Sequence, residues 1–590
     1  MRVTLNRLYE LFRRAFLRLS RRKNVTDNVA FLAHIEALAR AEASATPFES
    51  AFISLIVPVF DTEPEYLDDL IASVRAQPLG SWELILSDDG STRRATVAWL
   101  DRHAKAGDIQ IVRSAQNLGI ANATNLGLAA ATAPWVAFLD HDDALAPYAL
   151  DRIWGAIRSA PSCIFLYTDE IIADEKLRPI DFFLKPAYDP VLLSGVNYIN
   201  HLSVYRRDRL LEVGGLRQDF EGSQDYDLLL RYTRQLSRGD CLHVPYPAYI
   251  WRRHRASYSA RFIERATRNA RRALAQAYKV GDVELPVEPA QGGDLHRIRF
   301  DLKNRSWPLV SIIIPNRDSF TLISRLLNSL MLLTDYVSIE IIVVDNGSKD
   351  LSVLDLYEHY SAVMKGFVAV VEEEEFNFSR SINKGVALSH GEFLLLLNND
   401  VEIISCDWLK EMVACFDYPD VAVVGAKLLY PNRTLQHAGV IVGFGGLAGH
   451  WYLNQPSDFP GPMGRLWVRQ SLSAVTGACL MISREAITRT GPLDEANFPI
   501  AYNDVDFCLR TLADGFRVVW TPFATLIHHE SSSRGSDETP TNIKRFRKEQ
   551  LNLQTAHMTN VYDDFAISPW YSKDRSSPGR IMLKSLPPPR

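Results

Sequence analysis

Two pairs of carboxylates in the first half of the chain have a spacing that suits chemistry. Asp140 and Asp142 follow the apolar stretch 135–139, and side chains two residues apart in an extended segment point the same way. Such a pair can hold a hard divalent cation against diphosphate oxygens, and a solvated acidic loop is the alternative. Asp225 and Asp227 open an amphipathic segment, where one carboxylate can cap a helix and the other can act as a general base toward a hydroxyl.

The same features recur in the second half, which indicates a duplication. Residues 54–143 and residues 311–401 each run from an apolar strand that ends in proline, through an aspartate-containing turn, to an acidic strand end. The register holds to within one residue, and the repeat is far longer than a solenoid unit of about 20 to 50 residues. The sequence therefore predicts two homologous domains. The matched positions are Pro58 and Pro315, Asp88 and Asp345, Asp140 and Asn398, Asp142 and Asp400, and Asp225 and Asp504.

Two further features support a ligand site in each half. Asp88 and Asp345 are each followed by Gly-Ser directly after a buried apolar run, although a plain surface turn has the same composition. Histidine follows the acid pair at a similar distance in both halves, as His254 in the first and as His528 and His529 in the second. A lone histidine is usually structural, but its recurrence is consistent with metal ligation or diphosphate contact.

Short apolar runs alternate with helical patterns in both copies. In the first copy the runs 52–57, 82–86 and 135–139 are separated by the helical patterns 66–74 and 121–131. This alternation predicts βαβ units, hence an α/β fold with a mostly parallel, Rossmann-like sheet in each half. Parallel sheets bind ligands beyond the carboxyl ends of their strands, so the acidic clusters of one half are expected to converge on one crevice.

Proline and glycine interrupt the periodicity near residues 287–307, and we place the boundary between the copies there. The expected organisation is an N-terminal basic helical segment at 1–48, a first domain at 49–290, a second domain at 300–562 and a polar, proline-ended tail at 563–590.

Composition excludes some classes of function. The chain has 590 residues, of which 47% are hydrophobic and 23% charged, as in ordinary globular proteins. A net charge of −5 offers no general basis for binding nucleic acid. The six cysteines include no C-x-x-C pair, so we expect reduced thiols, mostly small core residues, rather than a disulfide frame or a zinc site.

The segment Met1–Lys23 differs in charge from the rest. It carries eight Lys or Arg against the single Glu10, with apolar residues at helical spacing, which predicts a basic amphipathic helix. Such a helix can lie on the anionic inner face of a membrane or pack on its own protein. The sequence has neither the roughly 18 to 20 consecutive apolar residues of a membrane span nor a signal-peptide pattern, so a cytoplasmic location is expected, with peripheral membrane contact through this helix as one option.

With these motifs the chain resembles the family 2 glycosyltransferases with the GT-A fold, in tandem, and above all the two-domain enzymes of bacterial O-antigen and related cell-surface polysaccharide assembly. The resemblance covers about residues 50–560. It implies that the turn aspartates contact the nucleotide base and that the D-x-D motif binds ribose and metal. By resemblance, the nucleotide donor contacts Pro58, Asp88, Asp140, Pro315, Asp345 and Asn398, the divalent metal (Mg²⁺ or Mn²⁺) contacts Asp142, His254, Asp400 and His528 or His529, and Asp225 and Asp504 are the catalytic bases.

Two departures from the family pattern matter. The glutamate that precedes the base in the family is Gln224 in the first half and Asn503 in the second, so the base has a neutral neighbour. The second half has Asn398-Asn399-Asp400 in place of D-x-D, which predicts weaker metal affinity there. This variant is similar to rhamnosyltransferase-like members of the family.

The resemblance implies a bifunctional, metal-dependent, inverting enzyme. Its donors would be UDP-, GDP- or dTDP-sugars, and its acceptor would be a lipid-linked or oligosaccharide glycan. One alternative is a single active domain, the first, with a degenerate second domain that grips the glycan. A non-catalytic carbohydrate-binding scaffold is the other alternative, and the duplicated acid and histidine positions argue against it.

Overall fold

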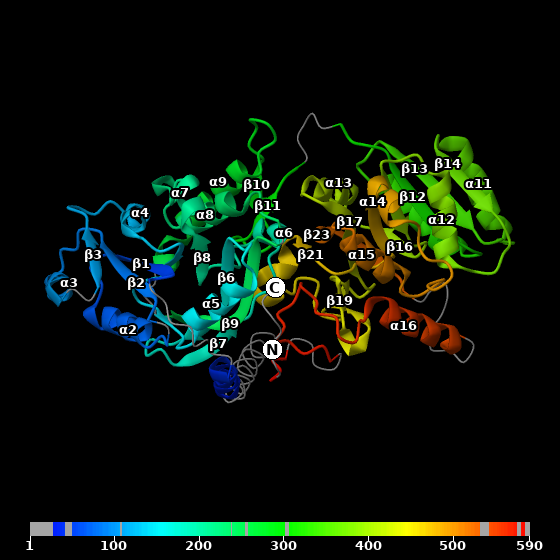
Figure 1. Cartoon of the computed structure of the whole chain (residues 1–590). Coiled ribbons are helices and arrows are strands. Elements are labelled where there is room, and N and C mark those ends of the chain that lie inside the picture. The colour runs from blue at the N-terminus through cyan, green and yellow to red at the C-terminus, as the bar shows by residue number, and fades with distance from the viewer. Residues whose placement is uncertain are drawn as a thin grey trace, which may run out of the picture.

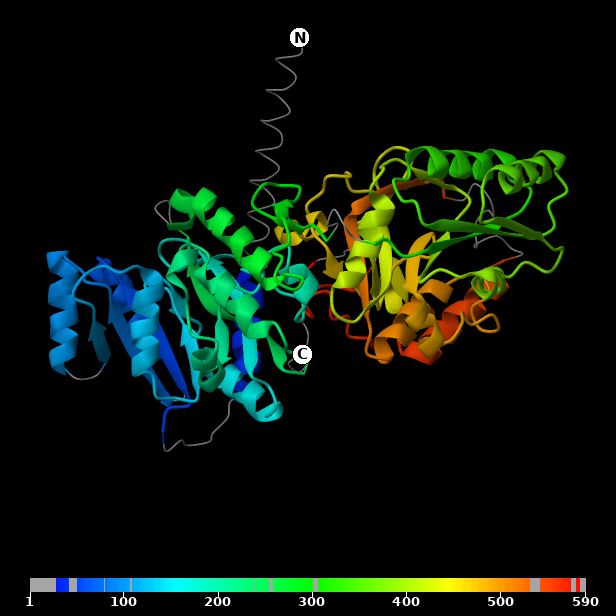
Figure 2. The ribbon, with the colours of Figure 1, turned by 90° about the horizontal axis from the view of Figure 1, so that it is seen from above.

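The computed structural model describes residues 28–41, 50–78, 80–106, 109–237, 239–253, 258–300, 306–530, 542–574 and 580–583. Two α/β lobes lie side by side, one from each half of the chain (Figures 1 and 2). The segment Met1–Lys23 and His254 lie outside the described residues, so their expected roles stay predictions.

The first lobe is built on a nine-stranded mixed sheet in the order β3-β2-β1-β4-β8-β6-β9-β5, with β7 beside β6. The first four strands of this order are parallel, and β8 runs antiparallel to both of its neighbours. The strands are β1 (Ile53–Val59), β2 (Trp82–Asp88), β3 (Gln110–Arg113), β4 (Trp135–Phe138), β5 (Ala144–Leu145), β6 (Phe165–Ala173), β7 (Pro179–Phe183), β8 (Ser203–Arg206) and β9 (Cys241–Arg252).

The second lobe repeats this topology strand for strand. Its order β14-β13-β12-β15-β22-β17-β23-β16, with β18 beside β17, matches the first sheet position by position, and β21 adds to β23. The strands are β12 (Val310–Asn316), β13 (Ile339–Asp345), β14 (Phe367–Val371), β15 (Phe393–Leu397), β16 (Val401–Ile403), β17 (Val421–Leu429), β18 (Leu435–His437), β21 (Gln470–Ser471), β22 (Cys479–Ser483) and β23 (Arg517–His528). The α/β class expected from the sequence is confirmed.

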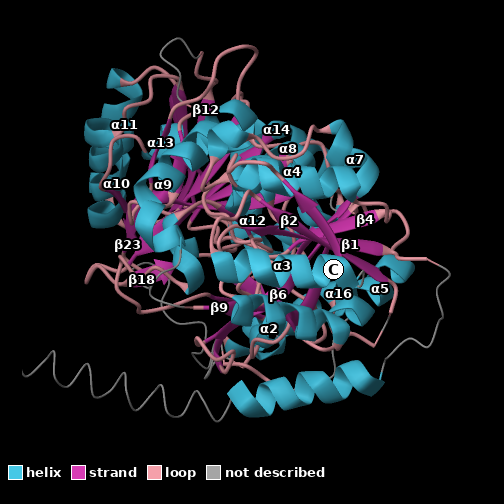
Figure 3. Cartoon of the chain, turned by 90° about the vertical axis from the view of Figure 1, so that its left-hand side faces the viewer, coloured by secondary structure: helices cyan, strands magenta, loops and turns pink. Residues whose placement is uncertain are grey.

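Helices cover the sheets (Figure 3). Helix α2 shows why they form, because Leu67, Leu70, Ile71 and Val74 recur at helical spacing and are all buried. The helices of the first lobe are α2 (Pro64–Arg75), α3 (Arg94–Ala106), α4 (Ile120–Ala130), α5 (Ala149–Ser159), α6 (Pro190–Leu193), α7 (Arg207–Glu212), α8 (Gln224–Thr233) and α9 (Tyr258–Ala277). Those of the second lobe are α10 (Phe320–Leu333), α11 (Leu351–Val363), α12 (Phe378–Leu388), α13 (Trp408–Ala414), α14 (Arg484–Thr490), α15 (Asn503–Ala513) and α16 (Ile543–His557).

The two lobes meet through buried polar contacts. Asp189 of the first lobe accepts hydrogen bonds from the backbone N–H (2.7 Å) and the hydroxyl (2.6 Å) of Ser471 in the second. Glu411 on α13 is bonded to Arg469 (2.6 and 2.7 Å) and to Arg297 (2.9 Å), which lies on strand β11 (His296–Ile298) of the hairpin formed with β10 (Val287–Pro289). One apolar cluster also runs through both lobes, so they share a continuous core.

The segment expected as a C-terminal tail joins the two lobes. Trp570 is fully buried and donates its indole N–H to the carbonyl of Pro245 at 2.7 Å. Its ring meets that of Phe31, on the helix at 28–41, edge to face at 5.1 Å. Asp564 accepts the backbone N–H of Val442 at 2.7 Å, so the same segment reaches the second lobe.

Two further expectations concern cysteines and membrane spans. All six cysteines are free thiols, and every one except Cys406 is buried, as expected. Among the described helices, none is both long enough and apolar enough to traverse a bilayer.

Candidate active site

Strand register brings the predicted residues of each half to one edge of its sheet. Asp88 ends β2 opposite Val59, and Pro58 lies opposite Ser87. On the other side of β1, the pairing with β4 ends at Ile56 and Phe138, so Asp140 follows directly at the same edge. The second half has the same arrangement, with Pro315 opposite Val344, Asp345 opposite Asn316 and Asn398 just beyond β15. The expected convergence at the carboxyl ends of the strands is therefore present in both halves.

The turn aspartates are buried and bonded within the protein. Asp345 accepts hydrogen bonds from the N–H of Ser348 (2.7 Å), its hydroxyl (2.6 Å), Tyr357 (2.6 Å) and Asn316 (3.2 Å). Asp88 accepts the N–H of Ser91 at 3.0 Å. Both carboxylates thus fix the shape of the loop that follows β2 or β13.

The D-x-D motif of the first half has a histidine partner that sequence reasoning missed. His201 Nε2 lies 3.5 Å from Asp140 Oδ2, and its ring stacks on Tyr249 at 4.6 Å. Glu170 and Lys185, an ion pair at 2.8 Å in the core, lie behind this histidine. Burial alone would lower the pKa of His201, but the carboxylates of Asp140 and Glu170 outweigh it and raise the pKa well above its ordinary value. The strand register matches His201 with Ala478, so the repeat gave no signal for it.

The rest of the acidic loop is held from strand β9. Arg252 donates its backbone N–H to Asp143 Oδ1 (2.7 Å) and its Nε to the carbonyl of Asp142 (2.6 Å). The hydroxyl of Tyr249 donates to Asp143 Oδ2 at 2.6 Å. Asp143 is therefore a structural anchor, and burial together with the neighbouring Asp140 and Asp142 raises its pKa well above the ordinary value. The anchor leaves the side chain of Asp142 on the open side of the loop, with about a fifth of its surface exposed.

The corresponding place in the second half is built around histidine. His528 Nε2 lies 3.1 Å from Asp400 Oδ1, and both residues are buried. Neither Asp400 Oδ1 nor His528 Nδ1 has a hydrogen-bond partner within the described part of the chain. Because β16 pairs with β23 as β5 pairs with β9, the counterpart of His528 in the first half is Trp251, three residues before His254. The similar spacing of His254 and His528 along the chain therefore does not reflect equivalent strand positions.

The donor atoms of the second half fit a divalent metal. Asp400 Oδ1, which has no hydrogen-bond partner among the described residues, lies beside His528 Nε2, and a carboxylate oxygen with an imidazole nitrogen are ligands that Mn²⁺ accepts. Across the described residues, no three His, Cys, Asp or Glu side chains are gathered closely enough to hold a metal alone. A metal there would need further ligands from a diphosphate, as is usual for nucleotide-bound Mg²⁺.

In each acid pair, one carboxylate is paired with cationic side chains and the other is not. Asp227 is buried between Arg217 (2.9 Å) and Arg231 (2.9 Å). Its counterpart Asp506 is bonded to Arg510 (2.8 Å) and His557 (2.8 Å). The second aspartate of each pair is therefore structural, and the first one remains for chemistry.

Asp225 and Asp504 begin α8 and α15 and face the strand ends. Asp225 keeps part of its surface exposed, although the protein around it removes water from the carboxylate, and the side-chain amide of Asn197 donates to it at 3.1 Å. Desolvation by the surrounding protein raises its pKa, and the charge of Asp140 adds to the rise. Asp504 Oδ2 accepts the N–H of Gly477 at 2.8 Å. A carboxylate with a raised pKa beside other acidic groups suits a general base.

Gln224 and Asn503, which replace the family glutamate, stabilise the turns before α8 and α15. Gln224 accepts the backbone N–H of Gly222 at 2.7 Å, and Asn503 donates to the carbonyl of Ile500 at 3.0 Å.

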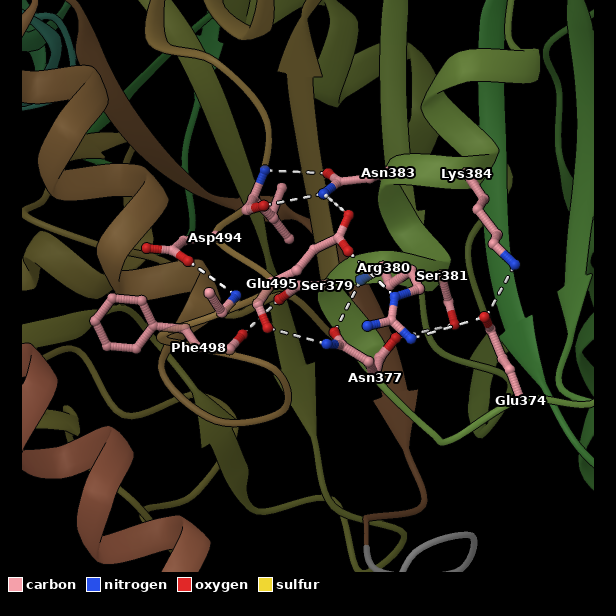
Figure 4. Close-up of polar contacts among 12 residues, drawn as sticks. Glu374, Asn377, Ser379, Arg380, Ser381, Asn383, Lys384, Asp494, Glu495 and Phe498 are labelled. Atoms are coloured by element: carbon pink, nitrogen blue, oxygen red, sulfur yellow. Dashed lines mark hydrogen bonds and ion pairs between the residues drawn. The ribbon is translucent and has the colours of Figure 1, made fainter.

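In each half, an asparagine side chain bonds to the backbone of the loop that precedes the helix with the candidate base. Asn383 on α12 donates to the carbonyl of Leu493 (2.9 Å) and accepts its N–H (3.1 Å). Asn125 on α4 does the same with Leu216 (2.8 and 2.9 Å). Figure 4 shows that Asn383 and Asn377 also reach Glu495, at 2.8 Å to its carboxylate and 3.0 Å to its carbonyl. The helix after the third strand thus fixes the position of the base-bearing helix in both halves, and sequence reasoning did not identify either asparagine.

Comparison with known proteins places the repeat in a family. Residues 54–211 and 311–491, together more than half of the chain, match the model described as Glycosyl transferase family 2. Both matched segments begin at the first strand of a lobe.

Two curated relatives align with nearly the whole chain. The uncharacterized protein y4gI of Sinorhizobium fredii is 38% identical over 89% of this chain and 58% of its own length. The O-antigen biosynthesis protein RfbC of Myxococcus xanthus is 36% identical over 85% of this chain and 39% of its own length. The chain thus spans about half the length of these relatives or less.

Solved structures resemble single regions of the chain. The mannosyltransferase PcManGT from Pyrobaculum calidifontis, in complex with GDP-Man and Mn²⁺, is 16% identical with a TM-score of 0.31, over 43% of this chain and 65% of its own. S. aureus TarS 1–349 in complex with UDP-GlcNAc is 16% identical with a TM-score of 0.33, over 39% and 68%.

Proposed function

Because the chain belongs to glycosyl transferase family 2, we propose that it carries two glycosyltransferase centres, one in each half, that add sugars from nucleotide-sugar donors to a growing cell-surface glycan. The observation that supports this most is the repeated position of one aspartate without a cationic partner, Asp225 or Asp504, at the start of the helix next to the acidic strand end. In each case its neighbour two residues on is held by arginine.

The reaction we assign to each centre is inverting transfer. Asp225 or Asp504 takes the proton from an acceptor hydroxyl while that oxygen attacks the anomeric carbon from the face opposite the diphosphate. The raised pKa of Asp225 favours this role, because a stronger base accepts the proton more readily, and such catalysis contributes about 10² to 10⁴ in rate.

The donor is assigned to the carboxyl edge of each sheet. Pro58, Asp88 and Asp140 line this edge in the first half. Pro315, Asp345 and Asn398 line it in the second half. Because Asp88 and Asp345 are largely bonded within the protein, we assign them to the shape of the nucleoside pocket.

We assign Mg²⁺ or Mn²⁺ to Asp142 and His254 in the first half and to Asp400 and His528 in the second. When bound, the metal would supply positive charge to the departing diphosphate. The unpartnered Asp400 Oδ1 supports this for the second half.

We also propose a donor and an acceptor, which family membership alone does not specify. The relation to RfbC favours O-antigen or a similar polysaccharide, with UDP-, GDP- or dTDP-sugars as donors and a lipid-linked or oligosaccharide acceptor. The Asn398-Asn399-Asp400 variant favours a rhamnosyl donor for the second half. A cytoplasmic enzyme held at the inner membrane face through Met1–Lys23 fits a lipid-linked acceptor.

A second candidate function keeps only the first half active, with the second as a glycan-binding domain. The loss of one carboxylate at Asn398 favours it, whereas the presence of Asp504 and of the Asp400–His528 pair favours two active centres.

Substitution of each candidate base distinguishes two active centres from one active centre with a glycan-binding domain. Asp225→Asn should abolish one sugar transfer and Asp504→Asn another, while both variants still bind donor. Full activity of both variants on every acceptor would refute the base assignment. Loss of activity in Asp225→Asn alone would leave the second half as a binding domain.

A further inference from the structure

Two histidines lie near the second candidate base, and one of them, His450, belongs to a hairpin that the first half lacks. His437 ends β18, and His450 ends β20 (Ala448–His450), which pairs with β19 (Val440–Val442). In the first half, the described chain between β7 and β8 contains only α6 and no counterpart of the β19–β20 hairpin. Whatever His450 does is therefore specific to the second centre.

One short loop connects these histidines to the reaction centre. The N–H of Thr476 donates to His437 Nε2 at 3.4 Å, and the N–H of the next residue, Gly477, donates to Asp504 at 2.8 Å. The carbonyl of Ala478 accepts the N–H of Asn398 at 3.0 Å. Three consecutive residues thus hold the histidine pair, the base and the metal-side strand end in fixed relation.

The hydrogen bonds fix the protonation pattern of both rings. Because a backbone N–H can only donate, His437 Nε2 must accept and the proton of the neutral ring must lie on Nδ1. His437 Nδ1 lies 3.0 Å from His450 Nδ1, so it donates to that atom. The proton of neutral His450 is therefore on Nε2, which becomes a hydrogen-bond donor.

Both imidazole rings are neutral, and they lie near acidic side chains as well as another histidine. Burial lowers the pKa of His437 well below its ordinary value, and protonation of His450 or His528 would lower it further. Burial also lowers the pKa of His450, against the opposing effect of the Asp504 and Glu530 carboxylates. A neutral N–H donor suits a hydroxyl oxygen, whereas a diphosphate would favour a cation. The proximity of Asp504 puts this donor on the acceptor side of the centre.

We propose that His450 positions the acceptor of the second centre, with its Nε2–H bound to a hydroxyl oxygen of the acceptor sugar beside Asp504. His437 acts through His450 by holding its tautomer. This assignment rests on the proposed function of the second half and adds to it a residue and a ligand class: a sugar hydroxyl, bound through a neutral donor.

The test compares three variants of the full chain. His450→Leu and His437→Leu should each raise the acceptor KM of the second transfer roughly three- to ten-fold with little change in kcat, the usual effect of losing one hydrogen bond. His437→Gln should stay near wild type, because its amide can accept from Thr476 and donate to His450. His359→Gln on the exposed face of α11 is the control. The acceptor probe is a panel of octyl glycosides of glucose, galactose, rhamnose and N-acetylglucosamine.

Two further readouts distinguish a failure of this assignment from a failure of the proposed function. Nucleoside diphosphate release without acceptor should be the same in every variant, and thermal unfolding should show that each one folds. An unchanged acceptor KM in His450→Leu, or equal loss in His437→Gln and His437→Leu, would overturn the assignment. Donor turnover without transfer to any panel glycoside would overturn the sugar-hydroxyl class. If wild type turns over no donor in its second half, the proposed function itself fails.

Discussion

His528 lies 3.1 Å from Asp400 at a strand position that Trp251 fills in the first half. The two centres therefore differ in more than the Asn398 substitution: the first places carboxylates and His201 around its acidic loop, whereas the second pairs one buried carboxylate with imidazole. Duplication has kept the sheet and the aspartate at the start of α8 or α15 but changed the side chains beside the acidic loop.

This difference predicts how the second centre depends on metal. His528→Gln should reduce the second transfer at limiting Mn²⁺ and recover it at saturating Mn²⁺, because loss of a ligand or its orienting partner typically weakens metal affinity about 10- to 100-fold. A metal titration of both transfers checks this, with the exposed His390→Gln as control. Equal loss of activity at every Mn²⁺ concentration would exclude His528 as a ligand.

Neighbouring aspartates of α8 should have opposite phenotypes. Asp225→Asn should remove the first transfer without lowering stability, because this carboxylate is exposed. Asp227→Asn should lower the free energy of unfolding by about 2 kcal/mol, because Arg217 and Arg231 lose a charged partner. Denaturant unfolding and transfer rates measured on both variants test the prediction. A stable Asp227→Asn, or a destabilised Asp225→Asn, would reverse the assignment of roles.

The contact between the lobes leaves no space at Gly195. A Cβ at this position would lie 2.5 Å from Val468 Cβ of the second lobe. Gly195→Ala should therefore destabilise the protein by roughly 1 to 3 kcal/mol, the usual cost of overpacking. Gly155 on α5 has no atom within 4 Å of such a Cβ, so Gly155→Ala should be neutral or stabilising. Calorimetry should show one joint transition for both lobes, and two independent transitions would contradict a shared core.

Acid should weaken this contact through Glu411. Burial alone would raise its pKa, but Arg469 and Arg297 outweigh burial and lower the pKa to about 2, from an ordinary value of 4.5. A depressed pKa in the folded state gives stability that is present above pH 4.5 and is lost as the pH falls toward 2. The difference corresponds to on the order of 3 kcal/mol. Unfolding measured across this range should be less pH-dependent in Glu411→Gln, and an unchanged slope would show that other groups dominate.

The repeat made much of the fold predictable. Each half carries apolar runs that alternate with helical patterns, and these local signals gave the α/β class and the convergence of Asp88 and Asp140 at one sheet edge. The local signals left open which aspartate of each pair is the base, and the family resemblance chose Asp225 and Asp504. The contacts of Arg217, Arg231 and Arg510 with the other aspartate give a physical reason for that choice.

Other features depend on tertiary contacts between distant residues. His201 reaches Asp140 across the sheet, and its counterpart Ala478 gave no sign of it. Trp570 stands in a stretch whose composition predicts a polar, proline-ended tail, yet it is buried against Phe31 and Pro245. Chain spacing also paired His254 with His528, whereas strand pairing gives Trp251 as the counterpart. None of these pairings leaves a periodic or compositional trace.

A donor screen tests the two-centre account most directly. Wild type, Asp142→Asn and Asp400→Asn are each incubated with a panel of UDP-, GDP- and dTDP-sugars and Mn²⁺, and the released nucleoside diphosphate is measured. The account predicts that the two variants lose activity toward different donors. If Asp400→Asn retains every activity while Asp142→Asn loses all of them, the second half is not a metal-dependent transferase and the account of two centres is wrong.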